Sequence, residues 1–226
     1  MTGGRVRLVG CGPGAADLLT LRAARAIAEA DVVVWSPTLL DESIVREHAH
    51  PDAELVAWPP ARQDDVLAVY DRAAAEGLDV VRLKGGDPTL FGELRDDLQA
   101  IRARGLELEI VPGVSAVTAA AAALCCEIAG PGTPLALVAA GAAPEGEGTV
   151  AVLNCGRDAA AVTGELEARG LRSSTPCAVL VGISRAGEIV VTCALDELAE
   201  TLRDYGASGV TIVLAGTAVG GARTPA

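Results

Sequence analysis

Three short turns carry the residues of this chain that are best suited to bind a ligand. They read Gly-Cys-Gly-Pro-Gly at 10–14, Gly-Gly-Asp-Pro at 85–88 and Pro-Gly-Val-Ser at 112–115. Each follows an apolar segment typical of a buried strand, and glycine lets a ligand approach the backbone closely. Ligands of open α/β sheets bind where such strands end. If the strands are parallel, the three turns converge on one edge of the sheet, and we expect a ligand site there.

The first turn has two interpretations. Its position between a strand and a helix, with Ala15 in the third small position and Asp31 further on, is compatible with a dinucleotide-binding turn. Pro13, however, lacks the amide that a pyrophosphate would need. The alternative is a connection that merely requires small residues. A nicotinamide-dependent oxidoreductase is therefore one hypothesis.

The other two turns are also open to two interpretations. Asp87 offers a carboxylate to hydroxyl or amine groups of a ligand, yet Asp and Pro are common in ordinary β-turns. Ser115 precedes an alanine-rich helix and could serve as its N-cap alone. The occurrence of three such turns, each after a strand, favours a ligand site.

Strand-like and helix-like segments alternate along the chain, which predicts an α/β fold with a parallel sheet. We expect strands at 6–9, 31–35, 55–58, 80–84, 108–111, 135–139, 150–154, 177–181, 188–192 and 210–214. We expect helices at 18–30, 64–76, 92–104, 115–126, 159–169 and 195–205. The Gly- and Pro-rich segment 130–134 interrupts this pattern. We therefore predict two α/β lobes, 1–130 and 131–226, with a ligand cleft between them.

The composition argues against several classes of function. The 226 residues carry a formal charge of −12 and only two Trp, two Tyr and one Phe, which disfavours nucleic acid as a partner. No apolar run reaches the roughly 18–20 residues of a membrane span. The six cysteines form no CxxC pair, and His48 and His50, expected in a surface loop, lie far from them in the sequence. We therefore expect no metal site and a reduced, cytoplasmic protein.

The motifs of the chain, in their order and spacing, resemble those of the S-adenosylmethionine-dependent tetrapyrrole methylases. The resemblance covers nearly the whole chain and includes the segments 9–14, 30–34, 81–88 and 111–115. It implies two α/β domains, a homodimer, and S-adenosylmethionine bound between the domains, and it replaces the dinucleotide interpretation of the first turn. By motif match the cofactor contacts are Pro13, Gly85, Gly86, Asp87, Leu90, Ser115, Ala116, Cys155 and Gly182.

Within this family the stretch 115–124, followed by Glu127 and Pro131, looks most like precorrin-4 C11-methyltransferases. Those relatives have an Arg- and Pro-containing loop that is shortened here to 141–148. This difference motivates the hypothesis of a non-catalytic relative that binds a tetrapyrrole or the cofactor.

Uroporphyrinogen-III methyltransferases are the second enzymatic hypothesis. The Lys-Gly-Gly-Asp sequence at 84–87 is closer to theirs. They carry an aspartate, however, where Ser36 follows Trp35 here, and Gly-Lys-Arg where 59–62 reads Pro-Pro-Ala-Arg. Both differences favour the precorrin-4 hypothesis.

The implied reaction requires no nucleophile from the protein, because the sulfonium donor already carries an activated methyl group. The main contribution of the protein would be orientation, and the sequence identifies no catalytic base. The expected substrate carries several carboxylates, so local cations must bind it in a chain that is acidic overall. The candidates, each also explained as an ordinary surface arginine, are Arg62, Arg95, Arg157 and Arg185.

Five further residues have plain structural interpretations. Lys84, the single lysine of the chain, is expected to be a solvated residue at the end of a strand. Trp35 and Trp58 are expected to pack in the core, although they could also wall a macrocycle pocket. Cys125 and Cys126 are expected to be small buried side chains of the alanine-rich helix.

Overall fold

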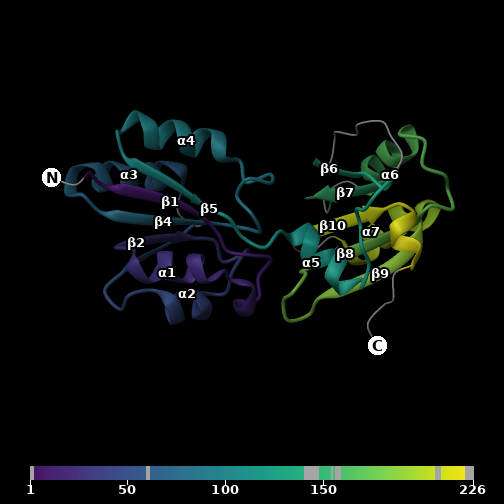
Figure 1. Cartoon of the computed structure of the whole chain (residues 1–226), viewed down its shortest axis with the longest axis horizontal. Coiled ribbons are helices and arrows are strands. Elements are labelled where there is room, and N and C mark those ends of the chain that lie inside the picture. The colour runs from purple at the N-terminus through teal and green to yellow at the C-terminus, as the bar shows by residue number, and fades with distance from the viewer. Residues whose placement is uncertain are drawn as a thin grey trace. The chain divides into compact units, whose positions relative to one another are not determined.

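The computed structural model describes residues 3–59, 62–139, 148–153, 155, 159–206 and 210–221. The chain forms two compact units, Met1–Ala116 and Val117–Ala226 (Figure 1). The sequence pattern places the boundary at 130, whereas the division falls earlier, at the start of α5 (Ala116–Ala123).

The sheet of the first unit is entirely parallel, as the sequence predicts. Its strands follow the order β3-β2-β4-β1-β5. They are β1 (Arg5–Gly10), β2 (Val32–Trp35), β3 (Glu54–Ala57), β4 (Asp79–Lys84) and β5 (Glu107–Val111). Since all five strands run the same way, the turns that follow β1, β4 and β5 lie at one edge.

Helices cover both faces of this sheet (Figure 1). On one face, alternate strand residues such as Val33 and Val81 pack in a core with α1 (Leu21–Glu29) and α2 (Glu42–His48). On the other face, residues such as Val80 pack in a second core with α3 (Gln63–Glu76) and α4 (Leu94–Ala103). The sheet is therefore buried on both sides, which explains its continuous apolar strands.

Two helical segments differ from the sequence prediction. The expected helix 18–30 divides into a short 3₁₀ turn, η1 (Ala16–Leu18), and α1, because the Thr20 side chain accepts a hydrogen bond from the Ala23 amide at 3.0 Å and caps α1. Helix α2 was not predicted, since it buries only Val45 fully and so has a weak apolar pattern. His48 therefore ends a helix and does not lie in a loop.

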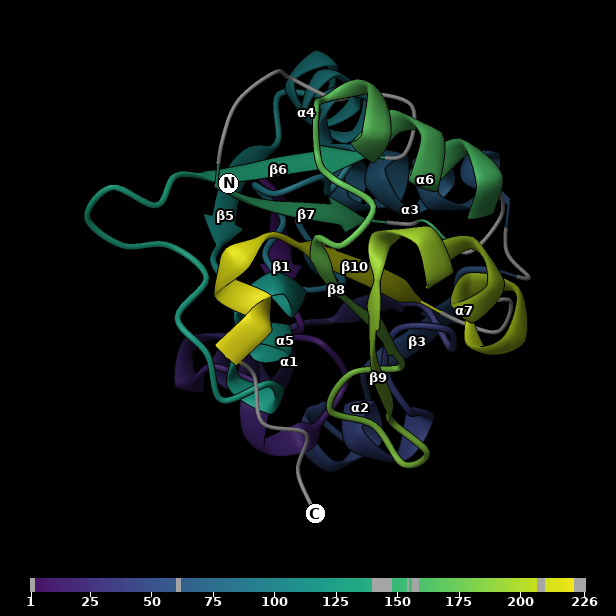
Figure 2. The ribbon, with the colours of Figure 1, turned by 90° about the vertical axis from the view of Figure 1, so that its right-hand side faces the viewer.

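The second unit contains a mixed sheet with the order β6-β7-β10-β8-β9 (Figure 2). Its strands are β6 (Leu135–Ala139), β7 (Thr149–Leu153), β8 (Pro176–Val181), β9 (Ile189–Ala194) and β10 (Thr211–Ala215). Strands β6 and β7 are parallel, whereas β10 is antiparallel to β7 and β8, and β8 is antiparallel to β9. The helical elements besides α5 are α6 (Ala159–Ala168), η2 (Leu195–Glu197), α7 (Leu198–Tyr205) and η3 (Thr217–Gly221).

The end of α5 corrects the prediction for the adjacent cysteines. The helix ends at Ala123, and Cys125 adopts a left-handed conformation with a φ of 50°. Cys125 is exposed and Cys126 is half-buried, so neither is a buried helical side chain. All six cysteines are free thiols. In the part of the chain that the structure describes, no helix has both the length and the apolar character needed to cross a membrane.

Candidate functional site

The three glycine turns lie against one another at the carboxyl ends of β1, β4 and β5. Gly12 and Gly86 exchange backbone hydrogen bonds, with N···O distances of 2.8 Å and 3.3 Å. A Cβ atom on Gly113 would lie 2.2 Å from the carbonyl oxygen of Gly86 and 2.9 Å from the Cα of Gly10. Such distances are far below van der Waals contact, so Gly113 has to be glycine. The predicted convergence of the turns is confirmed.

Asp87 connects two of these turns. Its Oδ1 accepts hydrogen bonds from the Thr89 amide at 2.8 Å and the Thr89 hydroxyl at 2.6 Å, and its Oδ2 accepts one from the Gly113 amide at 3.1 Å. Burial acts to raise the pKa of Asp87, but these three hydrogen bonds outweigh it and hold that pKa below its ordinary value. The carboxylate thus has the ordinary turn role and also fixes the turn 85–88 against the turn 112–115.

The remaining first-unit residues of the expected cofactor site lie around these turns. Ser115 and Ala116 are packed beside Gly86, because a Cβ atom on Gly86 would lie 3.8 Å from the Ser115 Cα and 3.4 Å from the Ala116 nitrogen. Gly85 faces Leu39, whose Cδ2 would be 2.9 Å from an added Cβ. The half-buried Pro13 lies in the first turn, and the exposed Leu90 follows the second.

Two expected contacts belong to the second unit. The Cys155 side chain is buried in the core of that unit, and its Sγ donates to the carbonyl oxygen of Thr211 at 3.3 Å. Burial raises the pKa of the Cys155 thiol to about 12, so this thiol stays neutral. Gly182 follows β8 with a φ of 61°, and its amide donates to the Val210 carbonyl at 3.1 Å. Only the backbone of these two residues could therefore contact a ligand.

The dinucleotide interpretation of the first turn is wrong. Asp31 precedes β2 and therefore lies at the amino ends of the parallel strands, at the opposite edge of the sheet from the glycine turns. Its Oδ2 accepts a hydrogen bond from the Asp79 amide at 2.8 Å. Because this carboxylate caps the start of β4, it cannot bind a ribose at the glycine turns.

A buried ionic cluster beneath the second turn was not foreseen. Lys84, expected to be solvated, places its Nζ 2.8 Å from Asp97 Oδ2, and its side chain is only 14% exposed. Arg82 Nη1 lies 2.5 Å from Asp97 Oδ1, and the Tyr70 hydroxyl donates to the same oxygen at 3.1 Å. An arginine within the apolar run 80–83 was the sequence signal for a buried partner, because arginine is rarely buried unpaired.

The two tryptophans differ in their surroundings. Trp35 is buried in the core of the first unit, as expected. Trp58 is 37% exposed, and the Arg82 guanidinium carbon lies 5.5 Å from the centre of its ring, so the core interpretation fails for Trp58.

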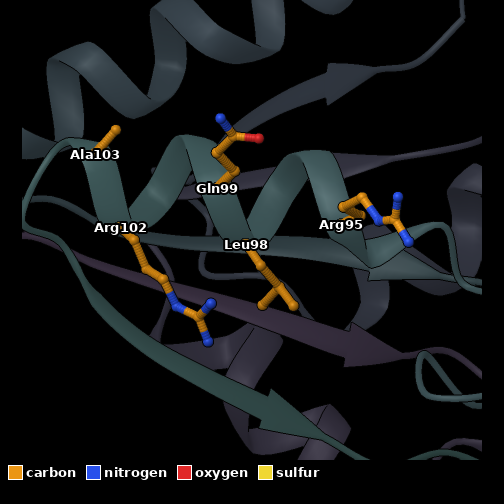
Figure 3. Close-up of a pocket in the computed structure, with 5 residues that line it drawn as sticks. All are labelled: Arg95, Leu98, Gln99, Arg102 and Ala103. Atoms are coloured by element: carbon orange, nitrogen blue, oxygen red, sulfur yellow. The ribbon is translucent and has the colours of Figure 1, made fainter.

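Three of the four candidate arginines lie in the described part of the chain, and each belongs to a segment other than the glycine turns. Arg62 precedes α3 with an exposed side chain, and Arg185 lies in the connection between β8 and β9. Arg95 lines an open hollow on α4 that contains none of the expected cofactor contacts (Figure 3). Arg157 and the loop segment 141–147 lie outside the described residues. Within the described ranges, no three His, Cys, Asp or Glu side chains gather as a metal ion would require.

Comparisons with known proteins agree with the sequence motifs. The family model described as Tetrapyrrole (Corrin/Porphyrin) Methylases matches residues 5–199. The precorrin-4 C(11)-methyltransferase of Rhodococcus erythropolis is 31% identical over 225 residues, covering 93% of this chain and 90% of that protein.

Two solved structures share the fold. A cobalt precorrin-4 methyltransferase superposes with a TM-score of 0.85 at 27% identity, covering 95% of both chains. The uroporphyrin-III C-methyltransferase of Thermus thermophilus, solved in complex with S-adenosylhomocysteine, has a TM-score of 0.77 at 29% identity, covering 96% of this chain and 99% of that chain. The family match includes all three glycine turns and the nine strands β1 to β9, and the chain belongs to the tetrapyrrole (corrin/porphyrin) methylases.

Proposed function

We propose that this chain is an S-adenosylmethionine-dependent C-methyltransferase that acts on a corrin precursor, precorrin-4, at carbon 11. One observation carries the proposal: the turns 10–14, 85–88 and 112–115 meet at one edge of the sheet, and Asp87 is bonded to the Gly113 amide there. Family membership supports the reaction class, and the Thermus relative in complex with S-adenosylhomocysteine supports the cofactor.

The residues at this edge fit a donor that combines apolar, hydroxyl and amine groups. Hydrogen bonds favour the ionised form of Asp87, so its carboxylate can accept from the hydroxyls or the amine of the donor. Leu90 and Phe91, which are 39% and 45% exposed, offer apolar surface to an adenine ring. The proposed contacts are those that the motifs assign: Pro13, Gly85, Gly86, Asp87, Leu90, Ser115, Ala116 and the backbone of Cys155 and Gly182.

S-adenosylmethionine, when bound, supplies an activated methyl group to a carbon of the macrocycle. The chain then has to hold the two reactants in line, and orientation of this kind can supply up to roughly 7–11 kcal/mol of barrier reduction. Fixed backbone turns suit this task, since their geometry does not depend on side-chain rotamers. We assign no catalytic base.

Ser36 favours precorrin-4 over uroporphyrinogen III as the substrate. Its buried hydroxyl lies 2.8 Å from the Thr38 hydroxyl, at the position where uroporphyrinogen-III methyltransferases are expected to carry an aspartate. A hydroxyl pair cannot replace a carboxylate as a base near neutral pH. The Thermus structure and the Lys-Gly-Gly-Asp sequence at 84–87 keep uroporphyrinogen III as the second candidate.

The test is methyl incorporation followed by mass spectrometry. The protein is incubated anaerobically with S-adenosylmethionine and either precorrin-4 or uroporphyrinogen III, and we expect one added methyl group on precorrin-4 alone. A product from uroporphyrinogen III alone would replace the substrate assignment. Binding of S-adenosylmethionine without any methylated product would support the non-catalytic relative. If calorimetry detects no binding of either S-adenosylmethionine or S-adenosylhomocysteine, the cofactor assignment is rejected.

We also propose a cytoplasmic homodimer. The resemblance to the family supports the dimer. The cysteine pattern of the sequence supports a cytoplasmic location. Light scattering after size-exclusion chromatography measures the dimer directly, and a monomeric mass would contradict it.

A further inference from the structure

Two cations of β4 share one buried carboxylate of α4. Arg82 and Lys84 are two residues apart on the strand, so their side chains leave the same face of the sheet. Arg82 binds Oδ1 of Asp97 and Lys84 binds Oδ2, at 2.5 Å and 2.8 Å. The Asp97 side chain is 3% exposed, and the neutral Tyr70 hydroxyl adds a hydrogen bond but no charge. The cluster of Tyr70, Arg82, Lys84 and Asp97 therefore carries one positive charge in excess.

Other charges near Lys84 do not remove this excess. Glu93, which precedes α4, attracts Lys84 through space, but it is exposed, where solvent weakens its field. Burial, together with the positive charge of Arg82, lowers the pKa of Lys84 in spite of the opposing effects of Asp97 and Glu93. Burial thus disfavours the charged ammonium of Lys84, and a further carboxylate partner would stabilise it.

Lys84 is the cation of the cluster that a ligand can most easily reach. Its side chain is 14% exposed, against 7% for Arg82, whose guanidinium is also covered by Trp58. The Lys84 carbonyl accepts a hydrogen bond from the Cys11 amide at 2.8 Å, and the next residue begins the turn 85–88. The amine is therefore attached to the same rigid edge as the proposed cofactor turns.

We infer that Lys84 binds a carboxylate of the tetrapyrrole substrate and that Asp97 is the positioning residue that holds the Lys84 amine. The identity of the ligand rests on the proposed function. An ammonium group has three donors, and the ion pair with Asp97 leaves others for a second acceptor. An incoming carboxylate would neutralise the excess charge of the cluster. The exposed surface of Trp58 offers an apolar contact to a macrocycle beside the Arg82 guanidinium.

The test measures binding of uroporphyrin, a stable porphyrin with carboxylate side chains, by fluorescence titration. We expect Lys84→Met to raise the Kd for uroporphyrin about ten- to a hundredfold, the usual effect of losing a charge-assisted hydrogen bond, and to leave the Kd for S-adenosylmethionine nearly unchanged. Lys84→Arg should recover much of the lost affinity, because it keeps the charge. The matched control is Arg72→Met, which removes a cation that pairs with Glu54 at 2.9 Å on the exposed surface. This substitution should change the Kd for uroporphyrin by less than about twofold.

A second measurement does not depend on any variant. Because Lys84 is the single lysine, selective labelling with ¹⁵N-lysine gives one side-chain ammonium signal in NMR spectra and leaves all three donors in place. We expect uroporphyrin to shift this signal. Any one of three results would overturn the inference. The Lys84 signal does not shift in the complex, the wild type does not bind uroporphyrin, or folded Lys84→Met binds uroporphyrin with unchanged affinity. A wild type that fails to bind S-adenosylmethionine would reject the proposed function instead, so the two failures are distinguishable.

Discussion

The carboxylate of Asp87 accepts a hydrogen bond from the amide of Gly113 at 3.1 Å, across 26 residues of chain. This bond joins the turn after β4 to the turn after β5. Asp87 makes this bond outside its own turn through Oδ2, whereas the two bonds from Thr89 reach Oδ1 within the turn. The proposed cofactor site thus depends on a contact between segments that are remote in sequence.

Replacing Asp87 should weaken cofactor binding without unfolding the protein. Asp87→Ala frees the turn 85–88 from Gly113 and removes the carboxylate, so the Kd for S-adenosylmethionine should rise about tenfold or more. The matched control is Asp41→Ala, because Asp41 accepts the same two hydrogen bonds from Ser43 that Asp87 accepts from Thr89. The control should lower stability slightly through the loss of the cap of α2 and leave cofactor affinity unchanged. Calorimetry measures both affinities, and equal losses would remove Asp87 from the site.

Acid should weaken the turn that Asp87 stabilises. The pKa of Asp87 is lower in the folded protein than the ordinary value of 3.8. The stabilisation is therefore fully present above the ordinary pKa and is lost as the pH falls through the folded value. The difference in free energy of unfolding between the wild type and Asp87→Asn, measured with urea from neutral pH to about pH 3, should shrink at the acid end. A constant difference would show that the ionised form of Asp87 is not stabilised.

Gly113 should tolerate no side chain. A Cβ atom there would overlap the Gly86 carbonyl, which is backbone and cannot rotate away, so Gly113→Ala should destabilise the protein by at least about 2 kcal/mol. Gly164→Ala is the control, since Gly164 lies in α6 and an added Cβ would meet nothing within 4 Å. That substitution should stabilise the protein by up to about 1 kcal/mol. Urea denaturation measures both, and a stable Gly113→Ala protein would contradict the packing of the turns.

The cysteines should differ strongly in reactivity. Burial raises the pKa of the Cys155 and Cys177 thiols to about 12, so both are protonated and covered near neutral pH. Cys125 is exposed and should react first with a disulfide reagent under native conditions. Cys125→Ser should abolish the fastest phase of thiol release, and an unchanged phase would place the reactive thiol elsewhere.

The parallel sheet and the meeting of the glycine turns were predictable, because they follow from apolar runs and turn residues that are local in sequence. The prediction of a parallel sheet was wrong for the second unit, where β8 and β9 are antiparallel, although the connection 182–188 is shorter than the dozen or so residues that a parallel crossover needs. The position of β10 between β7 and β8 could not be predicted, because strand order depends on contacts between residues that are remote in sequence. For the same reason the sequence did not pair Lys84 with Asp97, although Arg82 within an apolar strand signalled a buried partner.

The backbones of Gly10, Gly86 and Gly113 pack against one another, and this packing restricts which substitutions the protein can accept during evolution. A side chain on Gly10 or Gly113 would overlap neighbouring backbone atoms, and the φ of 63° at Gly86 strains any other residue, so substitution at these positions does not offer a route to a new substrate. Under the proposed function, we therefore expect changes in specificity for the macrocycle to arise at neighbouring positions such as Ser36, Trp58 and Lys84.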